Sequence, residues 1–170
     1  MSWRGSSSIQ DRFFAILPYA YPMLQASIFG SVLMSQFPVL ALLLLPLTPF
    51  IFVYGLLSSV LGQFTGLLIF FALYVLVVRN EKINHFIRFN TMQALLIGIA
   101  VDLIVLVLQL LGVSLGGLLS GVGAIPTLVI FSTIFIAVMV SSIYSIVCAL
   151  RGKYGEIPMI SEAAYAQVRY

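Results

Sequence analysis

Asp102 is the residue of this 170-residue chain whose position points most clearly to chemistry, because it interrupts a long apolar segment. No other charged residue lies between Arg88 and Arg151. A charged carboxylate near the centre of a membrane-spanning helix costs about 2.5–3.5 kcal/mol on insertion scales. At about 100° per residue, Gly98, Asp102 and Gln109 share one face of a helix. This polar face either lines a hydrated path or binds a partner's polar group, or its carboxyl group clamps two helices through a hydrogen bond.

Other reactive side chains are too isolated to suggest catalysis. His85 is the only histidine and Cys148 the only cysteine, so the sequence holds no cluster of nitrogen and sulfur ligands of the kind that zinc requires. No nucleophile stands beside a base, and no two carboxylates are placed for acid–base chemistry. The sequence therefore predicts a protein that is not an enzyme and that has no catalytic residues, cofactor or metal.

The composition identifies the elements that must position these residues. Apolar residues make up 62% of the chain and charged residues 8%, with a mean hydropathy of +1.16. A soluble domain has about 25% charged residues, which cover its surface in water. The sequence therefore predicts an all-α, polytopic membrane protein. It also excludes a nucleic-acid-binding protein, because the basic residues lie at the edges of apolar runs and form no stripe.

Four apolar windows are long enough to cross a bilayer, a distance that takes about 20 residues in a helix. They cover residues 37–57, 61–78, 91–111 and 125–149, within a transmembrane domain of residues 37–150. Four spans place all eight Lys and Arg residues on one side, as the positive-inside rule requires, with both termini cytoplasmic or stromal. Residues 13–36, interrupted by prolines and polar residues, are then expected to form a broken helix in the membrane interface. Residues 1–36 form an N-terminal region, and residues 151–170 a polar C-terminal tail.

Two shorter patterns suggest contacts. Ala137, Ser141 and Ser145 recur every four residues in the fourth window, a spacing that favours close helix packing. The connection at residues 79–93 combines basic, aromatic and amide side chains at helical spacing, which predicts a short amphipathic helix leading into the third span. Membrane anchoring explains its aromatic and basic residues, but a contact with a partner better explains two amides, Asn90 and Gln93, at the membrane boundary.

The same connection carries a resemblance to a known family. Arg79-Asn80, the run from His85 to Asn90 and Met92-Gln93-Ala94 resemble the signature of the Tic-twenty family, named for a subunit of the translocon at the inner envelope membrane of chloroplasts. The resemblance extends from about Asp11 to Arg151 and is closest to cyanobacterial or plastid-encoded members. It implies four membrane helices and a role in moving or inserting proteins. The expected motif and partner-contact residues are Arg79, Asn80, Phe86, Arg88, Phe89, Asn90 and Gln93.

Three functions remain open from the sequence. The first is a translocon subunit that forms or borders a polypeptide path, located in a cyanobacterial plasma membrane or a plastid inner envelope. The second is a small ion or solute channel that uses the Asp102 face, and the third is a membrane scaffold or assembly protein. The expected partners are other membrane subunits or a second copy of the chain, client polypeptides and the lipid bilayer, and no nucleic acid.

Overall fold

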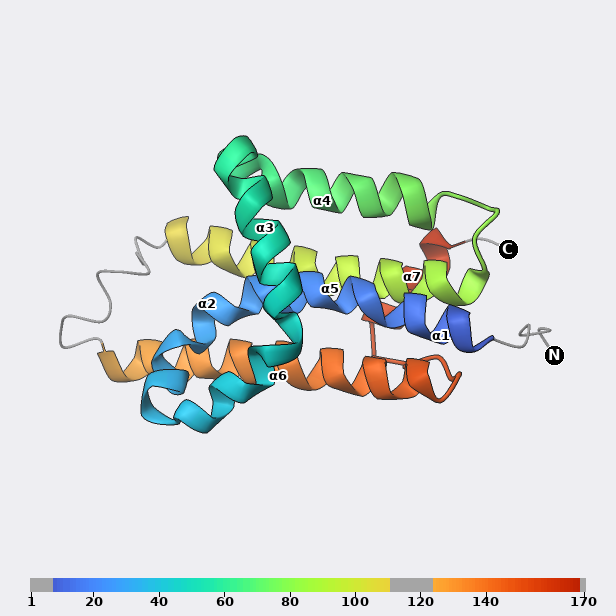
Figure 1. Ribbon diagram of the computed structural model, residues 1–170. Helices are drawn as coiled ribbons and strands as arrows, with labels where there is room; N and C mark the ends of the chain where they lie inside the picture. Colours follow the sequence, from blue (N-terminus) through green and yellow to red (C-terminus); the bar gives the residue numbers. More distant parts are fainter. Residues whose placement is uncertain (1–7, 111–123, 169–170) are drawn as a thin grey trace.

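The computed structural model describes residues 8–110 and 124–168, and every regular element within these ranges is helical (Figure 1). Four stretches are long and apolar enough to cross a membrane: Ile9–Ser31, Pro38–Val78, His85–Leu110 and Leu128–Leu150. The chain is therefore an all-α polytopic membrane protein, as its composition predicts. The expected connection between the third and fourth windows, at residues 112–124, lies almost entirely outside the described residues.

The N-terminal segment forms one long helical rod from α1 (Ile9–Ile16) through η1 (Leu17–Tyr19) to α2 (Ala20–Gln36). Ser8 caps its start, because the Ser8 hydroxyl accepts from the Asp11 amide (3.1 Å) and the Asp11 carboxylate accepts from the Ser8 amide (2.9 Å). The prolines do not break the rod. Pro18 lies at the start of the single 3₁₀ turn η1, where its missing amide hydrogen disturbs the backbone bonding least.

Residues 38–78 form a bent helical arm on one side of the rod. It consists of η2 (Pro38–Leu47), α3 (Thr48–Leu61), η3 (Gly62–Phe64), α4 (Thr65–Leu73) and η4 (Tyr74–Val78). In Figure 1, α3 crosses the N-terminal rod steeply, and α4 then runs along the bundle. Gly62 allows this change of direction, because its φ of +57° is readily adopted only by glycine.

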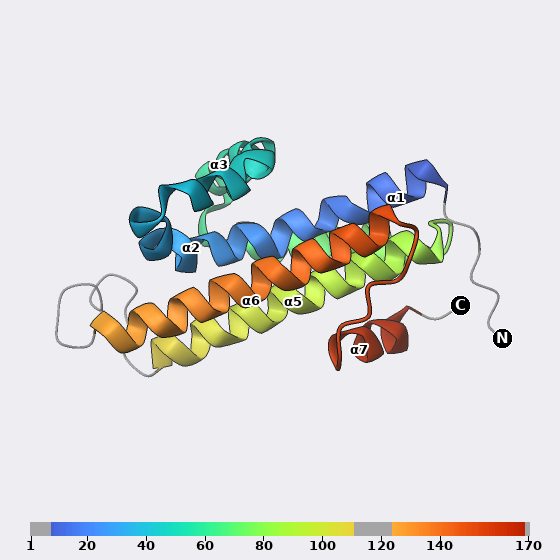
Figure 2. The same ribbon diagram turned by 90° about the horizontal axis from the view of Figure 1, so that it is seen from below.

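The core of the molecule lies between the N-terminal rod, α5 (His85–Leu110) and α6 (Ala124–Leu150), which run side by side in both views (Figures 1 and 2). Phe29 of α2 packs edge-on against Phe131 of α6, with ring centroids 5.2 Å apart. Close approach of these helices requires Gly30, because a Cβ atom there would lie 2.6 Å from the Phe135 ring.

Residues 13–36, which are expected to form a broken helix in the membrane interface, lie in the rod and pack against α5 and α6. Ala15, Tyr19, Ala26 and Phe29 are fully buried, and the rod is the central packing partner of α6 and α5. The polar residues that seemed to interrupt this segment are accommodated within it, since Ser27 and Ser31 bond to carbonyls of the previous turn. The windows at 91–111 and 125–149 correspond to α5 and α6, whereas the windows at 37–57 and 61–78 fall largely within one stretch, Pro38–Val78.

The C-terminal region also contains more structure than a polar tail. After Arg151 the chain turns back and forms α7 (Ile160–Gln167), which lies beneath the beginning of α5 (Figure 2). Tyr165 stacks at a tilt on Phe89, with centroids 4.4 Å apart, and Val168 is buried in the same cluster. These aromatic and aliphatic side chains hold the region against the bundle, because their burial removes apolar surface from water.

Candidate functional site

The segment at residues 79–93 is built around the beginning of α5. Asn84 caps this helix, because its side-chain oxygen accepts from the Phe86 amide at 3.0 Å. The amide group of Asn84 also donates to the Asp11 carboxylate at 3.0 Å, which ties the connection between α4 and α5 to the start of α1. Two segments distant in the sequence therefore meet at the end of the bundle where both termini lie (Figure 1).

Arg88 is buried below this connection, with 8% of its surface exposed. Its Nε atom donates to the Val78 carbonyl oxygen at 2.8 Å, so a cation lies at the C-terminal end of η4. A positive charge is favourable there, because the last carbonyl groups of a helix carry partial negative charge. Arg88 thereby joins the end of the arm to the beginning of α5.

An interior polar network, formed by Tyr19, Asn90, Gln93 and Ser145, connects the rod, α5 and α6. The Tyr19 hydroxyl donates to Asn90 Oδ1 at 3.1 Å, and Asn90 Nδ2 donates to the Phe86 carbonyl oxygen at 2.8 Å. Gln93 Nε2 donates to Ser145 Oγ at 3.1 Å and to the Gly155 carbonyl oxygen at 2.8 Å. All four side chains are fully buried. Gln93 therefore holds the segment after α6 against two helices of the bundle.

An aromatic cluster surrounds this network at the same end. Tyr154 packs edge-on against Phe86 and Phe89, with ring centroids 5.2 and 4.9 Å apart. His85 Nδ1 lies 3.1 Å from the Tyr154 hydroxyl, and His85 Nε2 lies 3.3 Å from the Val168 carbonyl oxygen. Among the described residues, no three side chains of His, Cys, Asp or Glu gather as metal ligands.

The motif residues are thus mostly interior, which differs from the expectation that they contact a partner. Phe86, Arg88, Phe89, Asn90 and Gln93 are buried among the chain's own helices because packing of α1, α6 and α7 around the first turns of α5 covers them. The surface positions of the motif are Arg79, which is exposed, and Asn80, which is half-buried.

Asp102 is exposed on α5, and the rod supplies its hydrogen-bond partner. Gln25 Nε2 donates to Asp102 Oδ1 at 2.9 Å and to the Tyr21 hydroxyl at 3.0 Å, and Tyr21 donates to the Gly66 carbonyl oxygen at 3.3 Å. Gln25 and Tyr21 are not among the partners that the sequence predicts for Asp102, although their spacing of four places them on one helical face.

The other members of the predicted Asp102 face have different surroundings. Gly98 lies against the rod, where a Cβ atom would be 2.6 Å from Tyr21 Cε1 and 2.9 Å from Gln25 Oε1. This position therefore has no room for a larger side chain. Gln109 is exposed near the C-terminal end of α5.

The small residues predicted to pack on α6 do not share one environment. Ser145 is fully buried against α5, whereas Ala137 is exposed and Ser141 is half-buried. Ala137 and Ser141 line a shallow hollow on the side of α6, next to residues 156–158. The face of α6 that packs on the rod instead carries larger side chains, because Gly30 of the rod leaves room for Phe135.

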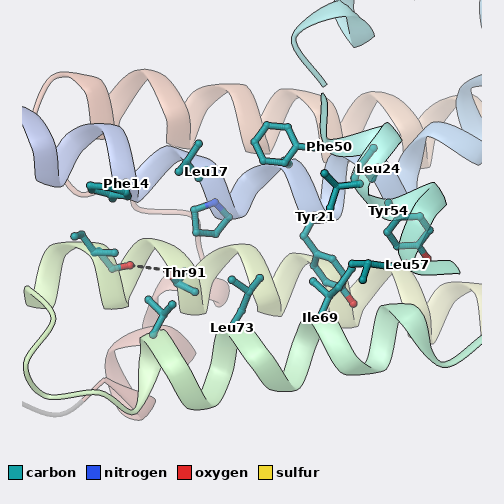
Figure 3. A pocket seen from close by; sticks show the side chains of 15 residues that line it. Phe14, Leu17, Tyr21, Leu24, Phe50, Tyr54, Leu57, Ile69, Leu73 and Thr91 are labelled. Atoms are coloured by element: carbon teal, nitrogen blue, oxygen red, sulfur yellow. Dashed lines mark hydrogen bonds between the residues drawn. The ribbon is translucent and has the colours of Figure 1, made fainter. Parts of the chain in front are cut away.

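Two cavities open between the rod, the arm and α5, and their walls differ in polarity. The polar cavity, of about 620 Å³, includes Asp102 and four other polar side chains: Tyr21, Gln25, Tyr54 and Gln63. The apolar groove, of about 450 Å³, runs along the rod from Phe14 to Tyr54 and Leu57 (Figure 3). Tyr21 and Tyr54 line both cavities.

The chain is similar in sequence to members of a known protein family. Residues 9–164 match the family described as chloroplast import apparatus Tic20-like. A Tic20 family protein of Synechocystis is 37% identical over 171 residues, covering all of both chains. Protein TIC 20-v, chloroplastic, of Arabidopsis thaliana is 32% identical over 97% of this chain and 75% of its own length. The Tic20 family protein Ycf60 of Porphyra purpurea is 31% identical over 96% of this chain and 78% of its own length. The signature at residues 79–94 and these matches agree, and the chain belongs to the Tic20 family.

Proposed function

We propose that this chain is a non-enzymatic membrane subunit of a protein import complex and that it borders the path of a translocating polypeptide. Membership in a family named for the chloroplast import apparatus supports the import role, and the match covers residues 9–164. The polar cavity beside Asp102 is the observation that carries the second part of the proposal.

A polypeptide that crosses a membrane needs partners for its backbone amide and carbonyl groups, since lipid offers none. The polar cavity supplies such partners from three elements: Gln25 of the rod, Tyr54 and Gln63 of the arm, and Asp102 of α5. Asp102 is accessible in the cavity while it accepts a hydrogen bond from Gln25. An extended client segment therefore finds both donors and acceptors along one side of the bundle.

The cavity lies on the side of the bundle, so this chain borders the path and another surface must close it. Large apolar side chains are exposed along the arm, among them Phe52, Leu56 and Leu68, and they suit contact with lipid or with a further membrane subunit. We therefore assign the closing surface to other subunits of the complex or to a second copy of the chain.

Photocross-linking of an arrested precursor tests the path. A photoreactive residue replaces Leu67, which lines the polar cavity, or the neighbouring Leu68, which is exposed outside it. We expect adducts with the precursor from position 67 and none above background from position 68, because the two side chains point to different faces of α4. Equal yields at the two positions, or no adduct at position 67, would contradict a path along this cavity.

The exposed carboxyl group of Asp102 on the wall of the polar cavity also favours a second candidate function, an ion or solute path that depends on the carboxylate charge. Asp102→Asn keeps an acceptor oxygen for Gln25, so the fold should be unchanged. Conductance or transport in vesicles should then change if the charge acts on a permeating species. Asp102→Leu removes the bond and should lower bundle stability by about 1 kcal/mol, the worth of one interhelical hydrogen bond.

The two variants distinguish the roles of Asp102. A change in transport with both variants indicates a charge beside the path. Wild-type transport with Asp102→Asn, together with a lower unfolding temperature for Asp102→Leu, leaves the carboxyl group as a clamp between the rod and α5. If both variants had the stability and the transport of the wild type, both roles would be excluded.

We further propose that the rod crosses the membrane and that the basic end of the bundle faces the cytoplasm or stroma. The N-terminus, the connection between α4 and α5, the end of α6 and the C-terminal region share this end (Figure 1). Every Lys and Arg residue in the described ranges belongs to it, and the positive-inside rule places such an end in the cytoplasm or its equivalent. The basic residues are Arg12, Arg79, Lys82, Arg88, Arg151 and Lys153. The Synechocystis relative supports a cyanobacterial plasma membrane, and the plastid relatives support an inner envelope.

A further inference from the structure

The apolar groove is separate from the polar cavity to which the polypeptide path is assigned, so it can hold a different occupant. Its walls come from four elements: α1 and α2 of the rod, α3, α4 with η4, and the first turns of α5. Figure 3 shows Phe14 at one end and Tyr54 with Leu57 at the other, so the groove is elongated along the bundle. At about 450 Å³ it falls within the usual range for bound small molecules, roughly 300–1,000 Å³.

The polar atoms on the groove wall are mostly committed to the chain itself. The Thr91 hydroxyl donates to the Ile87 carbonyl oxygen at 2.8 Å (Figure 3), and the Tyr21 hydroxyl donates to the Gly66 carbonyl oxygen at 3.3 Å. Tyr54 is at the far end of the groove. An extended peptide would leave its backbone groups without partners there, whereas a hydrocarbon chain needs none.

The shape of the groove suits a thin, flexible occupant. Its lining residues follow the rod from Phe14 to Leu24, and the groove ends at Tyr54 and Leu57 (Figure 3). A single hydrocarbon chain can lie along this length in contact with apolar side chains on several sides.

The end of the groove near Phe14 adjoins the basic end of the bundle. Three lining residues stand within two positions of a cation in the sequence: Phe14 is two residues after Arg12, Val77 two before Arg79, and Ile87 directly before Arg88. The bond between Asn84 and Asp11 holds these segments together at 3.0 Å. The described residues of these two segments, 8–16 and 79–88, carry four cations (Arg12, Arg79, Lys82 and Arg88) and two anions (Asp11 and Glu81).

Arg88 can offer hydrogen-bond donors to an anion. In the part of the chain that the structure describes, its Nε atom donates to the Val78 carbonyl oxygen, and its terminal nitrogens are not among the buried atoms that lack a partner. A guanidinium group has five donor hydrogens in a planar fork that matches the geometry of phosphate. The accessible terminal donors of this largely buried cation can therefore bind an anionic oxygen from outside the bundle.

We propose that the apolar groove binds one acyl chain of an anionic membrane lipid, whose headgroup phosphate lies at the basic end near Arg79, Lys82 and Arg88. The acyl chain follows the rod from Phe14 toward Tyr54, and the phosphate neutralises the excess positive charge at the mouth of the groove. Because lipid tails are as apolar as the groove wall, the preference for this lipid over others comes from the headgroup. This lipid site goes beyond the proposed import role and holds whether or not a polypeptide passes along the polar cavity.

Photoreactive lipids test the proposal in nanodiscs containing the full chain. Phosphatidylglycerol and phosphatidylcholine probes carry the same diazirine-labelled acyl chain, and adducts are mapped by peptide mass spectrometry. We expect adducts on groove residues with phosphatidylglycerol at severalfold higher yield than with phosphatidylcholine. The double substitution Arg79→Gln and Lys82→Gln should abolish this preference. The matched control, Arg151→Gln with Lys153→Gln, removes the same charge from the end of α6 and should preserve it.

A second pair of variants tests the groove itself. Leu73→Trp places an indole in the groove, and Leu76→Trp places one on the same helical arm outside it, at a position that is 65% exposed. We expect groove adducts to be lost in the first variant and kept in the second, with both proteins helical by circular dichroism. Equal yields with the two lipids, adducts that persist with Leu73→Trp, or cross-links from the groove to a client polypeptide in place of lipid would overturn the proposal.

Discussion

A cysteine at position 36 is expected to react with a membrane-impermeant maleimide only from the compartment opposite to the basic end of the bundle. Gln36 is the exposed last residue of α2, at the far end of the rod from Arg12. The rod is long enough to cross, because 28 residues from Ile9 to Gln36 at about 1.5 Å each span roughly 42 Å. The native Cys148 is replaced by Ser in the background, and labelling is measured in right-side-out and inverted vesicles.

Three further cysteines calibrate this measurement. Glu81 and Ala163 are exposed at the basic end and should label from the cytoplasmic or stromal side. Ser59 lies at the end of α3 and should label from the opposite side, together with position 36. If residues 13–36 lie in the interface and residues 37–57 form the first span, position 36 labels with Glu81 and Ala163 instead. That outcome would contradict a membrane-crossing rod while leaving the other three positions unchanged.

Gln93→Leu is expected to destabilise the bundle by about 1–3 kcal/mol, the cost of leaving buried polar groups without a partner. Leucine has a similar size but cannot donate to Ser145 Oγ or to the Gly155 carbonyl oxygen. Membrane insertion should be unaffected, since the apolar character of α5 increases. The thermal unfolding temperature in detergent should fall, and trypsin should cut more rapidly at Arg151 and Lys153, because the segment after α6 loses its attachment to α5.

Gln109→Leu is the matched control on the same helix, since Gln109 is exposed and the change should alter stability by no more than about 0.5 kcal/mol. Asn90→Ala should resemble Gln93→Leu in stability, because it removes the bond from Tyr19. Assembly on native gels then separates two roles for these amides. Normal stability with failed assembly would indicate a direct partner contact and contradict the interior role of Gln93.

The sequence by itself determined the class and the family of this protein. A chain with 62% apolar residues has too few polar residues to cover the surface of a soluble fold. The apolar windows predict helices, because a backbone exposed to lipid must satisfy its own hydrogen bonds. The run from Arg79 to Gln93 indicates the Tic20 family, and the family match over residues 9–164 confirms it. These properties follow from composition and local order, since each depends on residues that are near one another in the chain.

Only the tertiary structure decided which segments form the centre of the bundle and where the polar residues point. Prolines and serines favoured the membrane interface for residues 13–36, whereas the burial of this segment depends on distant partners such as Phe131 and Phe135 of α6. Asp102 stood out in the sequence, yet its partner Gln25 lies 77 positions away. Asn90 and Gln93 were predicted to contact a partner. Helical spacing shows which side chains share one face of a helix, but it does not show which other elements cover that face. Here the rod, α6 and α7 cover these side chains of α5. Such long-range packing cannot be read from a local sequence pattern.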